Sequence, residues 1–309
     1  MKKQTFCPKL WDEVFISEEG GVFTCCHKKP KIMGNIYQYK LQDICNNRII
    51  QDLRQESLAG RLSCYSSCTI LGKDKDRIPK ENIGINYSDL KRLKISFANA
   101  CNINCIMCGR NFKDKTFLDF DIIKKQIDLS PFDSIEIQGG EPLFIEAAKK
   151  FFDYAASMGK RISFLTNGIL INDEWAKKIA LHSSSVYFSL NAATKETHEF
   201  INKGSSWDLV LDNIQRVQSV RNALHTSVKI IGHMTIVVRN LGEIPLFIKI
   251  FRKLGFDSIN FGYDILVSPY LKRHFFKTRK LSLEIKEAIM SSEAPSLISD
   301  YRLKILGLV

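Results

Sequence analysis

From Leu93 onward, short apolar runs rich in β-branched and aromatic residues alternate with longer stretches of helical periodicity. The runs cover residues 93–98, 134–138, 161–166, 185–190, 228–238 and 258–263. The helical stretches between the later runs cover 145–159, 173–182, 206–220 and 244–255. Strand, helix and strand in this order pair in parallel through right-handed crossovers. The pattern predicts an α/β fold, a partial (β/α)6 TIM-like barrel that stops short of a closed barrel.

The cysteines divide the chain. All nine lie in the first 108 residues of 309, and six of them fall within residues 1–72 among short, turn-rich segments. The polar, charged stretch 73–90 carries Pro79 and is typical of a linker. We therefore expect a small cysteine-rich domain at 1–72, a linker at 73–90, the barrel at 91–270 and a tail at 271–309 with one helix at 281–293.

Composition limits the class of protein. With 45% hydrophobic and 25% charged residues, the chain is typical of a globular protein. No stretch approaches the roughly 20 apolar residues of a membrane span, and the amino terminus lacks the apolar core of a signal peptide. We therefore expect a cytoplasmic protein without a membrane partner. In that reducing compartment, cysteines are metal ligands or catalytic thiols more often than disulfide partners.

The formal net charge of +12 creates a positive field, although scattered lysines such as Lys73, Lys75 and Lys80 are typical of a solvated surface. An acidic peptide, a phosphorylated small molecule or a nucleic acid would be attracted by such a field. However, the sequence has no arginine-rich run interleaved with aromatic residues, so a nucleic-acid partner is not expected.

Three cysteines follow the first predicted strand. Cys101, Cys105 and Cys108 have C-x3-C-x2-C spacing, and parallel α/β folds build their active sites at the carboxyl ends of strands. Three thiolates leave one iron of a four-iron cluster without a protein ligand, where a cofactor can coordinate. A closed structural zinc site needs four ligands, and no histidine or fourth cysteine follows nearby. The spacing predicts a [4Fe-4S] cluster with one open iron.

The motifs that follow resemble those of the radical S-adenosylmethionine (radical SAM) superfamily. Gly139, Gly140, Glu141 and Pro142 come directly after the second strand and match the family's GGEP motif, which binds the methionine amino group of S-adenosylmethionine. Glycines let the backbone approach a ligand closely, and a glutamate offers a carboxylate to an ammonium group. The resemblance implies S-adenosylmethionine as a cofactor.

Later strand ends continue the resemblance, which covers about residues 91–265. Asn167 follows the third strand, where the family commonly has a polar residue near the cofactor, and Ser189 ends the fourth strand, where a serine contacts the ribose. Two positions depart from the family pattern. Asn191 stands where aspartate is frequent, and Lys203 stands where an arginine often holds the cofactor carboxylate. Lysine keeps the positive charge of arginine, but it lacks the planar guanidinium that donates two parallel hydrogen bonds to a carboxylate.

The amino-terminal region resembles the SPASM type of auxiliary-cluster domain, which in radical SAM proteins usually lies at the carboxyl end. The resemblance rests on Cys7 near Pro8 and Trp11, a hairpin around Gly20-Gly21, the segment 34–36 and a final C-x3-C. It implies a second [4Fe-4S] cluster with four cysteine ligands: Cys7, Cys25, Cys64 and Cys68. Cys26 is the alternative to Cys25, and a four-thiolate zinc ion is the alternative to the cluster. Cys45 is expected to be a small buried residue.

The resemblance also implies a mechanism. Reductive cleavage of S-adenosylmethionine gives a 5'-deoxyadenosyl radical that abstracts a substrate hydrogen atom. The auxiliary cluster then accepts an electron, so the substrate, preferably a peptide, is oxidised or crosslinked. A reductant such as flavodoxin or ferredoxin is the implied partner, and no further catalytic side chain is predicted.

Several alternatives remain at this point. One is a radical epimerase or dehydrogenase of a peptide, sugar or aminocyclitol; an epimerase would return a hydrogen atom to the substrate radical from the thiol of Cys26 or Cys45. A tRNA-modifying enzyme would need an RNA-binding module, which the sequence does not display. A non-enzymatic iron-sulfur electron carrier is disfavoured, because it would not need the GGEP loop.

Overall fold

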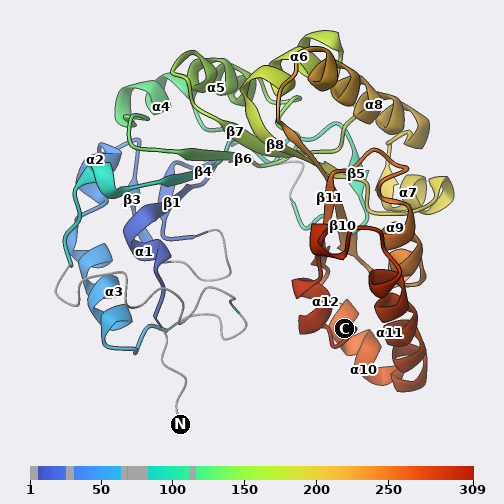
Figure 1. Cartoon of the computed structure of the whole chain (residues 1–309). Coiled ribbons are helices and arrows are strands. Elements are labelled where there is room, and N and C mark those ends of the chain that lie inside the picture. Colours follow the sequence, from blue (N-terminus) through green and yellow to red (C-terminus); the bar gives the residue numbers. More distant parts are fainter. Residues whose placement is uncertain (1–5, 26–30, 64–67, 69–82, 111–115) are drawn as a thin grey trace. The chain divides into compact units, whose positions relative to one another are not determined.

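The computed structural model describes residues 6–25, 31–63, 68, 83–110 and 116–309 (Figure 1). The chain forms two units. The first unit comprises Met1–Ala100 and Phe112–Ile162, and the second unit comprises Cys101–Asn111 and Ser163–Val309. Within the described ranges, no helix is both long and apolar enough to cross a bilayer. The domain boundary expected at residue 72 stays a prediction.

The first unit contains a sheet in the strand order β6-β4-β1-β2-β3. Its strands are β1 (Glu13–Ile16), β2 (Gly21–Phe23), β3 (Ile32–Asn35), β4 (Arg92–Ser96) and β6 (Ser134–Gln138). The predicted hairpin is confirmed, since β1 pairs with β2 antiparallel. β4 pairs in parallel with β6 as expected. It also pairs in parallel with β1, so strands of the cysteine-rich region continue the sheet of the barrel.

Glu13 fastens β1 to β4. Its carboxylate is 3% exposed and lies 2.6 Å from Lys9 Nζ and 3.2 Å from Arg92 Nε. Arg92 begins β4 and pairs with Glu13 in the strand register. A buried carboxylate needs such partners because an unpaired buried charge is strongly destabilising. This ion-pair group therefore selects the register between the two strands.

Helices cover the first unit. They are α1 (Lys9–Asp12), α2 (Leu41–Ile44), α3 (Arg48–Leu58), α4 (Phe120–Gln126) and α5 (Glu146–Ser157), with a 3-10 turn η2 at Tyr87–Asp89. α4 lies beside α5 (Figure 1). The rings of Phe97 and Phe151, whose centroids are 5.3 Å apart, join the end of β4 to α5. α4 is an element that the sequence analysis did not predict.

The second unit contains a sheet in the strand order β12-β11-β10-β8-β7. Its strands are β7 (Ile162–Thr166), β8 (Ser183–Ser189), β10 (Lys229–Ile236), β11 (Ser258–Tyr263) and β12 (Ile298–Ser299). β10 pairs in parallel with both β8 and β11. All six strands predicted for the barrel are therefore present, within a few residues of their expected bounds, and the predicted α/β class with parallel pairing is confirmed.

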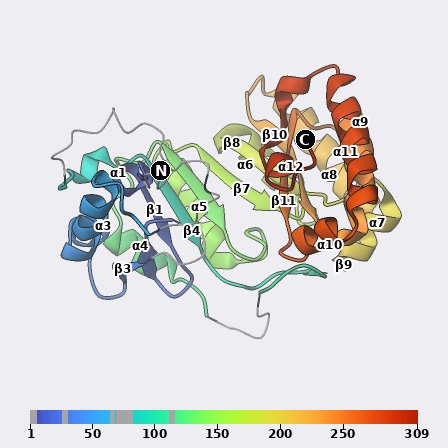
Figure 2. The same cartoon turned by 90° about the horizontal axis from the view of Figure 1, so that it is seen from below.

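The helices of the second unit are α6 (Asp173–His182), α7 (Lys195–Ile201), α8 (Trp207–Ala223), α9 (Ile244–Ile250), α10 (Val267–Arg273), α11 (Phe275–Met290) and α12 (Tyr301–Ile305). The 3-10 turns η3 and η4 cover Val238–Glu243 and Pro295–Leu297. α6 and α8 lie side by side in Figure 1, and α9 and α11 do so in Figure 2. Asn172 and Ser206 cap α6 and α8 by accepting hydrogen bonds from Trp175 N and Leu209 N.

Five helices of the second unit differ from the sequence predictions, and two of them, α7 and α10, have no predicted counterpart. α9 ends at Ile250 rather than at residue 255, and the chain turns there until Gly255 adopts a φ of +94°. α11 begins at Phe275, ahead of the predicted start at 281, because the basic residues of 277–280 are good helix formers. The tail also contains α12, where only one helix was expected.

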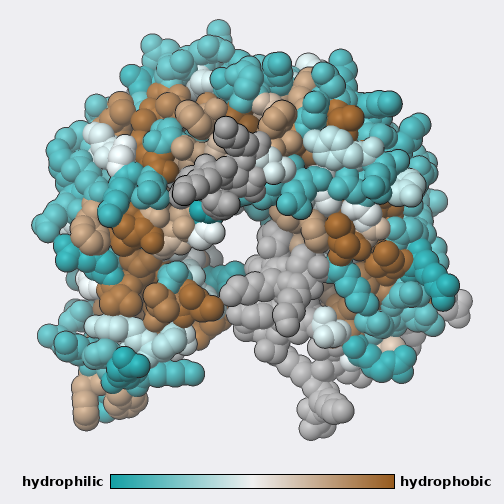
Figure 3. All heavy atoms as spheres, turned by 180° about the vertical axis from the view of Figure 1, so that it is seen from behind, coloured by the Kyte–Doolittle hydropathy of each residue, from teal (hydrophilic) through white to brown (hydrophobic). Residues whose placement is uncertain are grey.

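Hydrophilic side chains cover most of the face seen in Figure 3, and apolar side chains lie exposed between them in separate groups. The core is formed by the sheet faces that pack against helices. In the second unit, Val186, Phe188, Met234 and Phe261 are buried on that face. Side chains at alternating positions face the other way, because successive residues of a strand point to opposite sides.

Arg54 of α3 is a buried cation of the first unit, being 1% exposed. Its guanidinium donates hydrogen bonds to the carbonyls of Leu10 (2.8 Å), Cys45 (3.1 Å) and Ile83 (3.0 Å). Burial lowers its pKa to about 10, which still leaves it charged at neutral pH. One side chain thus joins α1, the end of α2 and the segment before β4.

We expect Arg54→Met to lower the free energy of unfolding by about 3 kcal/mol, because several buried carbonyls lose their donor. Urea titration followed by circular dichroism measures the change. Arg48→Met is the matched control, since Arg48 is exposed on the same helix. Equal urea midpoints for the two variants would contradict the role of Arg54.

Candidate cluster and cofactor site

The three predicted cluster cysteines lie in the second unit, on the loop that continues from β4. Cys105 belongs to a two-residue strand, β5 (Asn104–Cys105), and Cys108 N donates a hydrogen bond to Cys105 O at 3.0 Å. All three side chains are half-buried. Burial and, after it, the neighbouring Cys101 and Cys108 thiols together raise the pKa of Cys105 to about 12. The three sulfurs are therefore close enough to influence one another.

The donor set fits an iron-sulfur cluster. Three thiolates can each bind a different iron of a cubane, which leaves the fourth iron without a protein ligand. A thiolate raises the pKa of the thiols beside it, because two negative charges repel each other. A metal centre bound by all three sulfurs favours their thiolate forms.

Asn167 lies beside the first cysteine, on the loop after β7. Its Nδ2 is 3.8 Å from Cys101 Sγ and donates a hydrogen bond to Asn102 Oδ1 at 2.7 Å. Its Oδ1 accepts from Ile169 N at 3.1 Å, which orients the amide. The structure thus brings the predicted Asn167 together with Cys101, with a donor directed at the sulfur.

Lys203 and Cys105 lie on opposite faces of a small ladder. β5 pairs antiparallel with β9 (Asn202–Lys203), with Cys105 opposite Asn202 and Asn104 opposite Lys203. Because successive side chains of a strand alternate, Lys203 points away from the face that carries Cys105. Asn202 takes the position beside the sulfur, with its Oδ1 3.4 Å from Cys105 Sγ. Sequence reasoning missed Asn202, since only the pairing register places it there.

Ser189 ends β8 on the sheet face away from the helices. It lies in register with His233 of β10, which lies in register with Asn260 of β11. His233 Nδ1 and Asn260 Oδ1 are 2.6 Å apart, and burial lowers the pKa of His233. The predicted ribose contact thus belongs to a polar row across three strands. The other two members lie inside apolar runs, so no sequence signal marked them.

The GGEP segment lies in the first unit and contacts the chain that leads to Cys101. Gly140 N donates to Ala98 O at 2.8 Å, and Glu141 N donates to Ala100 O at 3.0 Å. A Cβ at Gly140 would overlap the carbonyl of Ala100, and Gly139 has a φ of +125°. Both glycines are therefore required by this backbone contact. Their expected approach to a ligand stays a prediction.

Glu141 and Pro142 are buried at the start of the turn before α5. Glu141 is 1% exposed, and its Oε1 accepts a hydrogen bond from Leu143 N at 3.2 Å. A carboxylate held in this way is oriented by the backbone rather than by solvent. This suits a group that must present one oxygen to a ligand, which is the role predicted for it.

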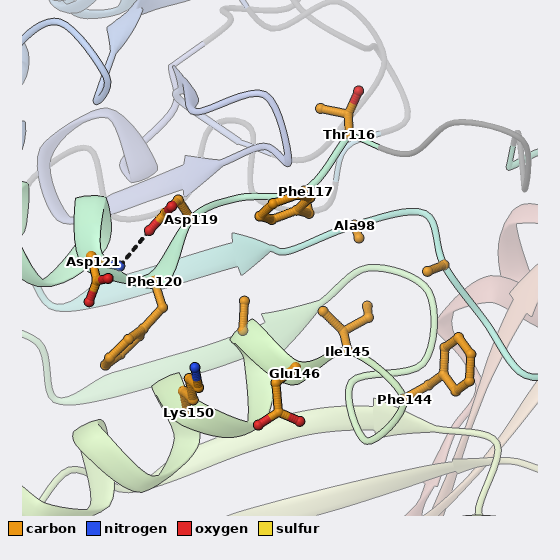
Figure 4. Close-up of a pocket in the computed structure, with 12 residues that line it drawn as sticks. Ala98, Thr116, Phe117, Asp119, Phe120, Asp121, Phe144, Ile145, Glu146 and Lys150 are labelled. Atoms are coloured by element: carbon orange, nitrogen blue, oxygen red, sulfur yellow. Dashed lines mark hydrogen bonds between the residues drawn. The ribbon is translucent and has the colours of Figure 1, made fainter.

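A cavity of about 410 Å³ adjoins the GGEP segment within the first unit (Figure 4). Apolar and acidic side chains line it: Ala98, Ala100, Phe117, Asp119, Phe120, Asp121, Phe144, Ile145 and Glu146, together with Thr116, Ala147 and Lys150. Tyr37, from the predicted SPASM-like region, forms hydrogen bonds with the segment 117–119 that lines one side of this cavity. Its hydroxyl donates to Phe117 O at 3.4 Å and accepts from Asp119 N at 3.0 Å.

The predicted auxiliary site is described in part. Cys7 is buried and its N donates to Ser57 Oγ at 2.8 Å, while Cys25 and Cys68 are half-buried. Cys64 and the alternative ligand Cys26 lie outside the described residues. Cys45 is buried as expected, and burial raises the pKa of its thiol to about 12. The ligand set of this second site stays a prediction.

Known proteins resemble parts of the chain. A probable GTP 3',8-cyclase of Methanocaldococcus jannaschii is 26% identical over 64% of this chain and 67% of its own length. Mycofactocin maturase MftC of Mycobacterium tuberculosis is 28% identical over 50% of this chain and 40% of its own length. The crystal structure of Streptococcus suis SuiB bound to precursor peptide SuiA is 16% identical, with a TM-score of 0.49 over 90% of this chain and 68% of that one. The chain spans about half to two thirds of the length of the first curated relatives it matches.

Two family models match successive parts of the sequence. The model of the iron-sulfur cluster-binding SPASM domain matches residues 7–69, and the model of the radical SAM superfamily matches residues 95–235. The second match contains all three cluster cysteines, the GGEP segment, Asn167, Ser189 and Lys203. The chain therefore contains a radical SAM domain at residues 95–235, preceded by a SPASM domain at residues 7–69.

Proposed function

We propose that this radical SAM protein cleaves S-adenosylmethionine reductively at the Cys101, Cys105 and Cys108 site, and that the 5'-deoxyadenosyl radical removes a hydrogen atom from a substrate. One observation carries the proposal. The GGEP segment is hydrogen-bonded to Ala98 and Ala100, so the predicted cofactor-binding segment is fastened to the residue that precedes the first cluster cysteine. Cluster and cofactor sites are thereby connected through one backbone.

The protein's own groups have distinct tasks in this proposal. Cys101, Cys105 and Cys108 would hold a [4Fe-4S] cluster with one open iron, and one-electron reduction of bound S-adenosylmethionine is the chemistry that this cofactor pair supplies. Asn167 Nδ2 points at Cys101 Sγ, where a donor stabilises negative charge on a ligand sulfur. The Glu141 carboxylate would accept a hydrogen bond from the cofactor's ammonium group. Ser189 would form a hydrogen bond with the cofactor's ribose hydroxyl.

For the net reaction, we propose oxidation or crosslinking of the substrate. The substrate radical would lose its electron to an auxiliary cluster held by Cys7, Cys25, Cys64 and Cys68, and a reductant such as flavodoxin or ferredoxin would supply the electron that cleaves the cofactor. Epimerisation would instead need an accessible thiol. Cys45, one of its two candidates, is 2% exposed, which disfavours that route.

A peptide is the proposed substrate. The net charge of +12 attracts an acidic peptide, and one relative is a maturase. Cyclisation of a nucleotide is the second candidate, because another relative is a probable GTP 3',8-cyclase that the chain matches over 67% of its length. Either reaction would use the same radical initiation.

Anaerobic reconstitution with iron and sulfide should load about eight irons per chain, from two four-iron clusters. The reduced protein should then release 5'-deoxyadenosine slowly from S-adenosylmethionine. Cys101→Ala should abolish this release, whereas Cys64→Ala should reduce the iron content and spare the release in part. Iron analysis and chromatography of the nucleoside measure both quantities.

Cys45→Ala is the control, because it should keep both the full iron content and the release. Four irons together with one zinc would disprove the auxiliary cluster but not the catalytic one. Release of 5'-deoxyadenosine by the Cys101→Ala variant would disprove the catalytic assignment.

Gly140→Ala should lower the rate of 5'-deoxyadenosine release by roughly a hundredfold, because a Cβ would push the GGEP backbone away from Ala100. Gly84→Ala is the matched control in the same unit, since a Cβ there meets no atom within 4 Å. Release rates at saturating S-adenosylmethionine measure the effect. Wild-type rates for Gly140→Ala would show that the backbone contact does not position the cofactor.

Short peptides encoded beside the gene provide the substrate test. Incubated with the reduced enzyme, the true substrate should lose two hydrogen atoms per oxidation, as mass spectrometry detects. The Cys101→Ala variant should leave the peptide unchanged. A guanosine nucleotide consumed in place of every such peptide would favour cyclisation instead.

A further inference from the structure

Asn202 is a buried amide in direct contact with the cluster loop. It is 0% exposed, lies on β9 and faces Cys105 across the β5–β9 ladder. The backbone extends this contact, because Ile106 N donates to Ile201 O at 2.9 Å. The segment that carries Cys105 is thus held by three consecutive residues, the last residue of α7 and the two residues of β9.

The side chain of Asn202 also holds the end of β8. Its Nδ2 donates to Ser189 O at 3.0 Å and to Leu190 O at 3.4 Å, and its Oδ1 accepts from Asn191 Nδ2 at 2.9 Å. These bonds occupy both ends of the amide, so its orientation is determined. Since Cys105 Sγ lies 3.4 Å from the same Oδ1, the sulfur is placed relative to β8.

Asn191 carries the connection further. Its φ of +60° is a left-handed conformation, which asparagine tolerates better than most residues. Its Oδ1 accepts from Thr235 N at 2.8 Å, and its carbonyl accepts from Asn240 Nδ2 at 2.8 Å. Asn191, Asn202 and Asn240 are all buried, and we call them the amide network. The network ties the end of β8 to β10 and to the turn that follows it.

We propose that Asn202 is a positioning residue for the cluster, which holds Cys105 in place through the amide network. The inference rests on the proposed function, since it concerns a ligand of the proposed cluster. It does not depend on a hydrogen bond from the thiol, because a metal-bound sulfur has no proton to donate. Backbone pairing and the saturated amide determine the position instead.

The test compares Asn202→Ala with Asn213→Ala. Asn213 is a matched control, since it is also 0% exposed in the second unit and donates to Gly168 O at 2.7 Å and Ile169 O at 3.2 Å. Reconstituted proteins are exposed to an iron chelator, and iron release is followed by absorbance. Asn202→Ala should lose four irons roughly tenfold faster than wild type. Asn213→Ala should release them at the wild-type rate despite a comparable fall in melting temperature.

Asn202→Asp provides a second readout. The carboxylate has the shape of the amide but adds negative charge beside the Cys105 sulfur, so the midpoint potential of this cluster should become more negative. The S-adenosylmethionine-induced change in the electron paramagnetic resonance spectrum identifies the open-iron cluster. The Asn213→Asp potential should equal that of wild type. This measurement decides the question by itself if the alanine variant does not fold.

The two possible failures are distinct. Equal iron release from Asn202→Ala and Asn213→Ala, with unchanged potentials in both aspartate variants, would overturn the positioning role. A wild-type protein without any spectrum that responds to S-adenosylmethionine would instead overturn the proposed function. Faster release in Asn202→Ala, together with a lower potential in Asn202→Asp, would support the proposal.

Discussion

The backbone contact between the GGEP segment and residues 98–100 is the constraint on which the site depends. Hydrogen bonds from Gly140 N and Glu141 N to Ala98 O and Ala100 O extend the β4–β6 pairing past the ends of both strands. A side chain at Gly140 would break them. The motif therefore has a structural requirement for glycine that holds before any ligand binds. A ligand-binding requirement can only add to it.

In the second unit, hydrogen bonds between buried polar groups hold the end of β8 and the segment after α7 in place. Leu190 O accepts from His198 Nδ1 (2.6 Å) and from Asn202 Nδ2 (3.4 Å), and His198 Nε2 pairs with Ser205 Oγ at 2.8 Å. Burial lowers the pKa of His198, so its ring is neutral and can both donate and accept. Buried polar networks of this kind make the structure rigid and specify one arrangement when every group is satisfied. That property suits a loop that must present three sulfurs in fixed positions.

The sequence predicted the parts of this site that carry a local signal. Strand periodicity located β4, β6, β7, β8, β10 and β11, and motif order placed the three cysteines, Glu141, Asn167 and Ser189 at strand ends. The strand register could not be predicted from the sequence. Asn202 and Lys203 are neighbours in sequence, yet only β5–β9 pairing decides which of them faces Cys105. His233 and Asn260 likewise lie in apolar runs, and they meet only because β10 and β11 are in register.

The amino-terminal position of the SPASM domain has a structural consequence. In a barrel that began at β4, one edge of that strand would lack a partner, and exposed strand edges invite unwanted pairing. Here β1 pairs with that edge in parallel, and the buried Glu13 group determines the register. Tyr37 then reaches the segment at Phe117 and Asp119, beside the GGEP cavity. The SPASM domain and the GGEP segment thus share one sheet. A change in β1 can therefore reach the GGEP segment through β4 and β6.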